Sequence, residues 1–348
     1  MIDIYSMLPE ELEEYFVSIG EPKFRAKQVF PRLNIGTPIE ELTMLSKPLR
    51  ARLKEETLNT LPSVAEKLVS KIDGTVKYLF RLHDGSCIES VLMKYKHGNS
   101  LCISSQVGCY MGCRFCASTI GGKVRDLLPS ELLLQVAVAA ADSGERVSNI
   151  VMMGIGEPLD NFDNVVKFLR LVNHPDGLNI GYRHISLSTC GVVPGIYKLA
   201  EVDLPITLSI SLHAATDEKR SAIMPVNNKW KIAELLSACV DYYKTTGRRI
   251  SFEYTLISGK NDSQRDAEEL ASLLTAAFRS SGAPLHVNLI RVNEVKETGF
   301  KRGSTESANE FARVLEARGI VATVRRRLGG DVNAACGQLR RSKMAEEK

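Results

Sequence analysis

The chain has 348 residues, of which 44% are hydrophobic, and a formal net charge of +4. Its length exceeds a typical single domain, and so small a charge excludes a polycation that binds nucleic acid through overall charge. No run of about 18 apolar residues is present, nor an apolar segment after a basic start, so we expect a cytoplasmic protein without a membrane partner. Eight cysteines in such a chain indicate metal or redox chemistry instead of a disulfide framework.

Residues 1–62 are predicted to form a helical accessory domain with exposed basic faces. An acidic turn after Pro9 begins the first helix, which ends by Gly20, and a second helical run begins near Lys23. Arg25 and Lys27 are candidate RNA contacts, with a merely solvated surface as the alternative interpretation. A second basic cluster near the C-terminus, open to the same two interpretations, comprises Arg325, Arg326, Arg327, Arg340, Arg341 and Lys343.

Residues 63–94 are predicted to form a β-hairpin adaptor. Two β-rich runs, 76–83 and 87–93, flank Asp84-Gly85, a dipeptide typical of tight hairpin turns. We therefore expect two antiparallel strands between the helical segment and the main domain.

Residues 95–328 are predicted to form an α/β core. Alternating strands and helices predict parallel strands joined by right-handed crossovers, and six such units predict a partial barrel, in which functional groups collect at the carboxyl ends of the strands. A last β-like run, 319–325, leads into a glycine-rich loop and basic tail, 329–348. The six strands are expected at 101–106, 147–153, 184–189, 206–212, 249–257 and 285–290.

Four of the eight cysteines lie in one stretch of fifteen residues. Cys109, Cys113 and Cys116 have the spacing C-x-x-x-C-x-x-C, and Cys102 precedes them by seven residues. An iron–sulfur cube has four irons, so three thiolate ligands at this spacing suggest one iron left open. A closed zinc site is the alternative, but it needs four ligands, usually from a second C-x-x-C pair, and the sequence contains no such pair.

Polar residues and glycine follow several of the other predicted strands. Gly156 and Glu157 come after the second strand, where glycine permits close backbone approach and a carboxylate can pair with an ammonium group. Each remaining position is unremarkable alone, but their repetition at successive strand ends predicts a shared ligand site. These positions are Ser188, Ser211, Leu212, His213 and Asn293.

The cysteine spacing, followed by β-α units, is typical of radical S-adenosylmethionine (SAM) enzymes. With further runs along the sequence, nearly the whole chain resembles the RlmN/Cfr family of dual-specificity RNA methyltransferases, closest to RlmN. These runs are 20–28, 88–95, 102–109, 156–161, 211–213 and 331–339. The resemblance implies a partial (β/α)6 TIM-type radical SAM barrel and one [4Fe-4S] cluster on Cys109, Cys113 and Cys116, with SAM on the open iron. It also implies that SAM contacts Gly156, Glu157, Ser188, Ser211, Leu212, His213 and Asn293.

The resemblance further implies a reaction that uses two SAM molecules. Cys336 takes a methyl group from one SAM, and the second is cleaved to a 5′-deoxyadenosyl radical that abstracts hydrogen from this S-methyl group. The resulting carbon radical adds to an adenine, for which Glu89 is the implied proton acceptor. Cys102 then attacks the sulfur of Cys336, and the transient disulfide frees the methylated base. The sequence leaves open whether Glu89 or Cys102 removes the ring proton.

The implied substrate is an adenosine of 23S rRNA in the peptidyl transferase centre, methylated at C2. Gly-Glu-Pro-Leu at 156–159 and the run after Cys116 favour this over C8 methylation of the Cfr type, which confers antibiotic resistance. A non-enzymatic, metal-containing RNA-binding protein is the third hypothesis. The sequence leaves open whether tRNA, at C2 of the adenosine 3′ to the anticodon, is a second substrate. We expect a monomer that receives electrons from a donor such as flavodoxin or ferredoxin.

Overall fold

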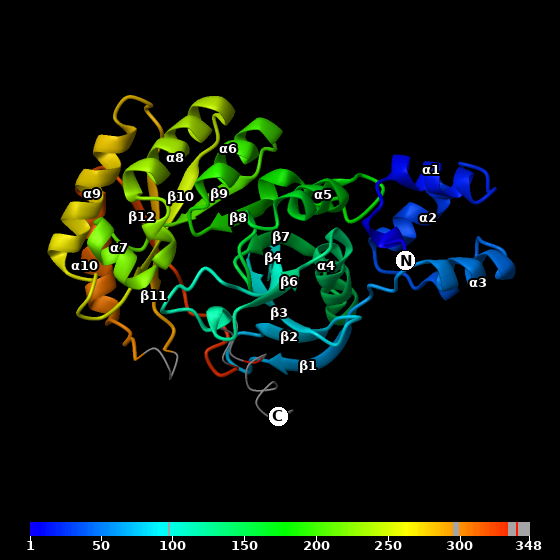
Figure 1. Cartoon of the computed structure of the whole chain (residues 1–348). Helices are drawn as coiled ribbons and strands as arrows, with labels where there is room; N and C mark the ends of the chain where they lie inside the picture. Colours follow the sequence, from blue (N-terminus) through cyan, green and yellow to red (C-terminus); the bar gives the residue numbers. More distant parts are fainter. Residues whose placement is uncertain (97, 295–298, 333–338, 340–348) are drawn as a thin grey trace.

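The computed structural model describes residues 1–96, 98–294, 299–332 and 339. A mixed sheet of ten strands organises this part of the chain (Figure 1). A smaller sheet pairs β5 (Gln106–Gly108) with β6 (Lys123–Asp126). In spatial order, the strands of the large sheet are β1 (Ser63–Val69), β2 (Val76–Arg81), β3 (Cys87–Tyr95), β4 (Gly98–Cys102), β7 (Val147–Met152), β8 (Ile185–Thr189), β9 (Thr207–Ser211), β10 (Ile250–Leu256), β11 (His286–Arg291) and β12 (Val321–Val324).

The part of the large sheet from β4 to β12 is parallel and confirms the predicted α/β partial barrel. The run predicted at 319–325 forms β12, which adds a further parallel strand beside β11. Helices cover the outer face of this curved sheet (Figure 1), and every residue of β10 is buried, as expected for a central parallel strand. None of the described helices is long and apolar enough to cross a membrane. The helices of this part are α4 (Pro129–Ser143), α5 (Phe162–Asn173), α6 (Val193–Val202), α7 (Asp217–Ile223), α8 (Ile232–Thr246), α9 (Gln264–Phe278) and α10 (Thr305–Glu316).

The predicted hairpin is confirmed, because β2 and β3 are antiparallel neighbours on either side of Asp84-Gly85. It is nevertheless no separate unit, since β3 also pairs with β4 and so joins the barrel sheet. The sequence analysis missed β1, which pairs with the outer edge of β2. Residues of β1 are exposed or half-buried, so this strand lacks the apolar run that marks the others.

Three N-terminal helices, α1 (Pro9–Ser18), α2 (Arg25–Asn34) and α3 (Lys47–Glu56), form the predicted helical bundle. Figure 1 places them at one end of the molecule, beyond α4 and α5. Buried hydrogen bonds fix this position: Asn34 Nδ2 donates to the carbonyl of Leu171 on α5 at 3.0 Å, and Ser6 Oγ accepts the N–H of Ser130 on α4 at 2.9 Å. Because buried amide and hydroxyl groups need partners, these contacts specify how the bundle meets the barrel.

Candidate functional site

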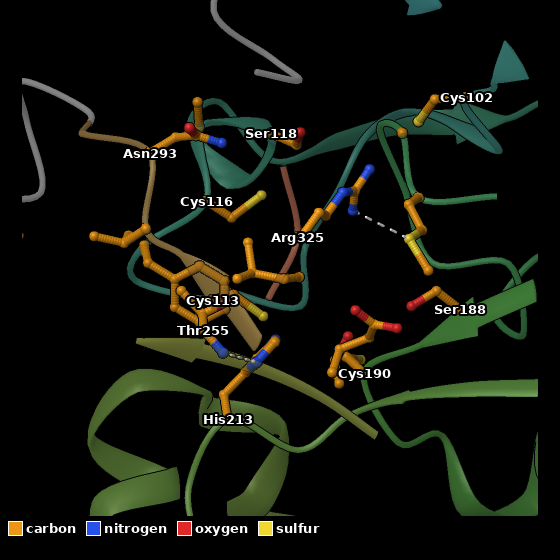
Figure 2. Close-up of a pocket in the computed structure, with 18 of the residues that line it drawn as sticks. Cys102, Cys113, Cys116, Ser118, Ser188, Cys190, His213, Thr255, Asn293 and Arg325 are labelled. Carbon is orange, nitrogen blue, oxygen red and sulfur yellow. Dashed lines mark hydrogen bonds between the residues drawn. The ribbon is translucent and has the colours of Figure 1, made fainter. Parts of the chain in front are cut away.

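A cavity of about 630 Å³ lies at the carboxyl ends of the parallel strands. Figure 2 shows Cys113 and Cys116 on one side of it and Ser188 on the other. Among the predicted site residues, Leu212 and Glu89 are not part of the lining, and Cys336 lies outside the described residues. The predicted residues that line the cavity are Cys102, Cys109, Cys113, Cys116, Gly156, Glu157, Ser188, Ser211, His213 and Asn293.

The three motif cysteines lie in the loop between β5 and β6. The strand predicted at 101–106 is wrong in its second half: β4 ends at Cys102, and the N–H of Ser105 donates to the carbonyl of Ile155 at 2.8 Å. The chain then forms β5, and the loop closes where the N–H of Cys109 donates to the carbonyl of Gly122 at 3.2 Å. This separate hairpin holds the cysteine loop over the strand ends.

Cys109 and Cys113 are buried thiols that keep their protons unless a metal binds them. Burial raises the pKa of Cys109 to about 12 and raises the pKa of Cys113 as well, and the neighbouring cysteines raise both further. Bound iron would reverse this balance, because a coordinating thiol loses its proton. Within the described ranges, no three His, Cys, Asp or Glu side chains are arranged to hold one metal ion. A cube does not require such convergence, since each thiolate binds its own iron, so the residues present fit the cluster.

Glu157 places a buried carboxylate beside this loop. Its Oε2 accepts the N–H of Cys190 at 2.7 Å, and its Oε1 accepts the N–H of Leu159 at 3.0 Å. Burial raises the pKa of Glu157, and these hydrogen bonds only partly oppose that rise. Both donors are neutral, so a ligand ammonium in the cavity would supply the positive charge that favours the ionised carboxylate. The carboxylate therefore fits the amino group of SAM.

Gly154 and Gly156 allow the loop after β7 to approach another part of the chain. A Cβ on Gly154 would lie 2.5 Å from the carbonyl oxygen of Ile103, and one on Gly156 would lie 2.7 Å from the nitrogen of Gln106. Gly156 also has a φ of +108°, which other residues rarely adopt. Glycine was predicted here for approach to a ligand, but the structure shows that it also lets the loop carrying Glu157 pack against residues 103–106.

Replacing Gly156 with alanine should lower the free energy of unfolding by about 3 kcal/mol, because backbone strain and overpacking add. Urea unfolding of the metal-free protein measures this loss. Gly121→Ala is the matched control: its φ of +91° is similarly strained, but its Cβ would meet nothing within 4 Å. That variant should lose only about 1 kcal/mol. Equal losses in the two variants would show that the close approach to Gln106 contributes nothing.

His213 is buried beneath the cysteine loop, immediately after β9. Its Nδ1 accepts the N–H of Thr255 at 3.0 Å, a bond drawn in Figure 2, and its ring meets the Phe115 ring edge to face with centroids 4.9 Å apart. Burial, with help from Arg220, lowers the pKa of His213 to about 3, so the imidazole is neutral near pH 7. Because Nδ1 accepts, Nε2 carries the proton and is the nitrogen that can donate to a ligand.

Arg220 is a structural residue of the site that the sequence analysis missed. Its fully buried guanidinium donates to the carbonyl of Cys190 at 2.7 Å, to that of Ser211 at 3.2 Å and to that of Leu212 at 3.1 Å. These bonds hold the ends of β8 and β9 together. Leu212 takes part only through its backbone carbonyl, because its side chain lies in the apolar core. One arginine in a short helix gives no sequence signal for such a role.

Glu89 is fully buried and forms an ion pair with Lys77, whose Nζ lies 3.1 Å from Oε2. Alternation along β3 places Glu89 on the same face as Val91 and Met93, which line the cavity. Cys102, on the neighbouring strand β4, packs against Val91 and Met93. Glu89 thus shares the cavity face of the sheet with Cys102 but does not itself line the cavity.

The chain after β12 passes along the cavity. Residues 325–329 line it, and Arg325 extends into its middle (Figure 2), where Nη1 lies 3.7 Å from the sulfur of Met153. Arg325 also acts on Glu253, a buried carboxylate of β10 in the cavity wall that the sequence analysis missed. Burial raises the pKa of Glu253, and the charge of Arg325 opposes this rise.

Comparisons with known proteins agree with this architecture. Residues 103–272 match the family model of the radical SAM superfamily, and residues 2–58 match that of the ribosomal RNA large subunit methyltransferase N-terminal domain. A crystal structure of a radical SAM methyltransferase from Sphaerobacter thermophilus is 41% identical, covers 97% of this chain and 99% of its own, and has a TM-score of 0.91.

Curated relatives match over their full length. A protein of Alkaliphilus metalliredigens, named "Probable dual-specificity RNA methyltransferase RlmN", is 50% identical over 100% of this chain and 97% of its own length. A protein of the same name from Lachnoclostridium phytofermentans is 52% identical over 98% of this chain and 95% of its own length. With such identity along the whole sequence and a shared barrel, the chain belongs to the RlmN family of radical SAM proteins.

Proposed function

We propose that the chain methylates C2 of an adenosine of 23S rRNA in the peptidyl transferase centre. The observation that carries this proposal is the single cavity that gathers the three motif cysteines, Glu157 and Cys102. The relatives described above bear the RlmN name, which favours C2 over C8 and an enzyme over a metal-containing binding protein. Methylation of tRNA beside the anticodon is a second proposed activity.

The family's cofactors fit particular residues of the cavity. A [4Fe-4S] cluster on Cys109, Cys113 and Cys116 would supply the electron that cleaves SAM to a 5′-deoxyadenosyl radical. Glu157 would bind the SAM ammonium, while Ser188, Ser211, His213 and Asn293 present polar groups around the remainder of the ligand.

The chain's own thiols would carry the methyl group. The Cys336 thiolate forms a carbon–sulfur bond to the SAM methyl as the sulfonium bond breaks, and S-adenosylhomocysteine leaves. Once the carbon of this S-methyl group is joined to adenine, the adduct loses the ring proton and one electron, for which the oxidised cluster would be the acceptor. Cys102 then attacks the sulfur of Cys336. The carbon–sulfur bond breaks as the disulfide forms, which releases the base. The position of Cys102 in the cavity wall supports this role, and the buried Glu89 on the adjacent strand is the proposed proton acceptor.

Glu157→Gln should weaken SAM binding about 30-fold or more, because a buried charge pair loses one partner while the side chain keeps its size. Equilibrium dialysis with labelled SAM on the cluster-loaded protein measures the change. Iron content serves as the control and should equal that of the unmodified chain. Unchanged SAM affinity would remove Glu157 from the ligand site.

RNA contacts are proposed on the exposed basic face formed by α2 and the turn before it, and the structure changes which residues best test them. Arg25 is half-buried, stacks on Phe24 and pairs with Glu21 at 3.6 Å, so charge reversal there would also disturb folding. Lys23 and Lys27 are exposed. Unlike Arg25, both can be altered with little effect on packing.

Lys23→Glu and Lys27→Glu should each weaken binding to 23S rRNA fragments and reduce the slope of log K against log salt by about 1. Filter binding across a salt series gives both quantities. Lys244→Glu is the matched control, an exposed lysine on α8, far from α2 in Figure 1. A slope that stays the same in the Lys23 and Lys27 variants would remove this face from the RNA site.

We further propose a division into an RNA-binding accessory domain (1–62), an adaptor (63–94), a radical SAM core (95–328) and a C-terminal carrier segment (329–348). A cytoplasmic monomer that takes electrons from flavodoxin or ferredoxin completes the proposal. Anaerobic reconstitution with unmodified 23S rRNA and labelled SAM, followed by mass mapping of the methyl group, tests the activity. Label at C2 supports the proposal, label at C8 indicates the Cfr type, and no label contradicts both.

A further inference from the structure

The turn between β1 and β2 is a rigid surface feature for which the reaction described above has no role. Ser70 and Thr75 close it through a backbone hydrogen bond of 2.8 Å. Ser70 Oγ accepts the N–H groups of Ile72 and Asp73 at 3.2 and 3.3 Å, and Asp73 Oδ1 accepts the N–H of Thr75 at 3.0 Å. Such side-chain caps hold a turn in one conformation.

This turn binds the segment that follows β12. The N–H of Gly329 donates to Asp73 Oδ2 at 2.8 Å. In return, Asp331 accepts from Ser70 Oγ at 2.6 Å through Oδ1 and from the N–H of Lys71 at 2.9 Å through Oδ2. The β1–β2 turn and the segment after β12 therefore each provide one carboxylate that accepts hydrogen bonds from the other, although more than 250 residues separate them in the sequence. We call these three hydrogen bonds the carboxylate latch; Figure 1 shows the C-terminal segment in red beside β1 and β2.

The latch is formed where the chain leaves the cavity. Leu328, one residue before Gly329, packs against Cys102 and its neighbours on β3, Val91 and Met93. Asp331 stands five residues before Cys336. Five residues span at most about 18 Å, so anchoring Asp331 fixes the point from which the short chain to residue 336 starts.

Both carboxylates are ionised at neutral pH. Burial acts to raise the pKa of Asp73, but hydrogen bonds from Gly329 and Thr75 outweigh it and lower the value to about 2. The hydrogen bond from Ser70 lowers the pKa of Asp331. Hydrogen bonds to ionised acceptors are stronger than neutral ones, so replacement of either carboxylate by an amide weakens the latch.

We propose that Ser70, Asp73 and Asp331 are positioning residues that hold the carrier segment so that Cys336 reaches the cavity. The inference rests on the proposed role of Cys336 and adds residues from β1–β2 to it. The side chains of Ser70, Asp73 and Asp331 do not line the cavity, so their replacement leaves the proposed SAM and cluster ligands unchanged. Loss of the latch therefore slows the methylation of Cys336 without slowing SAM cleavage.

The test compares Asp73→Asn and Asp331→Asn with Asp262→Asn, whose carboxylate likewise accepts a glycine N–H, that of Gly259 at 2.9 Å, but in a different turn. Mass spectrometry follows S-methylation of Cys336 in the cluster-loaded protein with SAM, 5′-deoxyadenosine release is measured in parallel, and hydrogen exchange reports on residues 325–332. The two latch variants should methylate Cys336 about tenfold more slowly and exchange faster, at an unchanged rate of SAM cleavage, since each loses a charge-assisted hydrogen bond.

Methylation of Cys336 at the unmodified rate in both latch variants would overturn the inference. Should either variant unfold, Ser70→Ala removes a single hydroxyl and decides the question by the same two rates. Failure of the proposed function looks different: the unmodified chain itself would then carry no methyl group on Cys336.

Discussion

A chain that carries Cys336→Ala should still release 5′-deoxyadenosine from SAM under reducing conditions, yet transfer no methyl group to RNA. The expected loss is complete, because alanine offers no sulfur to accept the methyl group and the electron-poor C2 of adenine does not attack SAM directly. SAM cleavage should persist, since the motif cysteines and Glu157, which would hold the cluster and SAM, are unchanged in this variant. Anaerobic assays with labelled SAM measure both products in one reaction.

Two further cysteine variants sharpen this experiment. Cys87→Ala is the matched control, since Cys87 is a half-buried cysteine that does not line the cavity, and this variant should methylate RNA normally. Cys102→Ala should stall one step later and leave RNA covalently attached to Cys336, visible as a slower band on a denaturing gel. RNA methylation by the Cys336→Ala chain would contradict the carrier role outright.

The barrel could be predicted because each of its strands and helices has a local pattern of apolar residues in the sequence. The strands that form β7 to β11 are short apolar runs between amphipathic helices, and their alternation restricts the topology. The strand β1 carries no such signal, because its residues are exposed or half-buried and it depends on the edge of β2 for partners. The break after Cys102 was missed because residues 103–105 are apolar or small and continue the strand pattern. Their hydrogen bonds nevertheless diverge: the N–H of Ser104 donates to the side chain of Gln135, and that of Ser105 donates to the carbonyl of Ile155.

Two kinds of local signal indicated residues of the cavity: the spacing of the cysteines and the position of polar residues at the ends of predicted strands. Cys109, Cys113 and Cys116 are close in sequence, so their spacing alone indicated a shared ligand. The Lys77–Glu89 pair and the carbonyl contacts of Arg220 join side chains to distant parts of the chain. No local pattern specifies that a given charge will be buried, because burial depends on how separate elements pack. Roles of this kind emerge only from the folded chain.

If Cys109, Cys113 and Cys116 bind the [4Fe-4S] cluster, the Cys113→Ala variant should fail to retain it. After anaerobic reconstitution, the unmodified chain should hold about four irons, whereas two thiolates cannot retain the cube. Iron and sulfide analysis and visible absorption measure the loss.

Cys190→Ala is a demanding control, because Cys190 lines the same cavity and is 8% exposed against 9% for Cys113. Burial raises the pKa of both thiols, so neither exposure nor acidity separates them. What separates them is position: Cys113 lies in the loop between β5 and β6, whereas Cys190 follows β8, where its N–H binds Glu157 and its carbonyl binds Arg220. These are backbone contacts that alanine keeps, so Cys190→Ala should retain full iron content. Loss of iron from the Cys190 variant with retention in the Cys113 variant would reverse the ligand assignment and place the cluster against the end of β8.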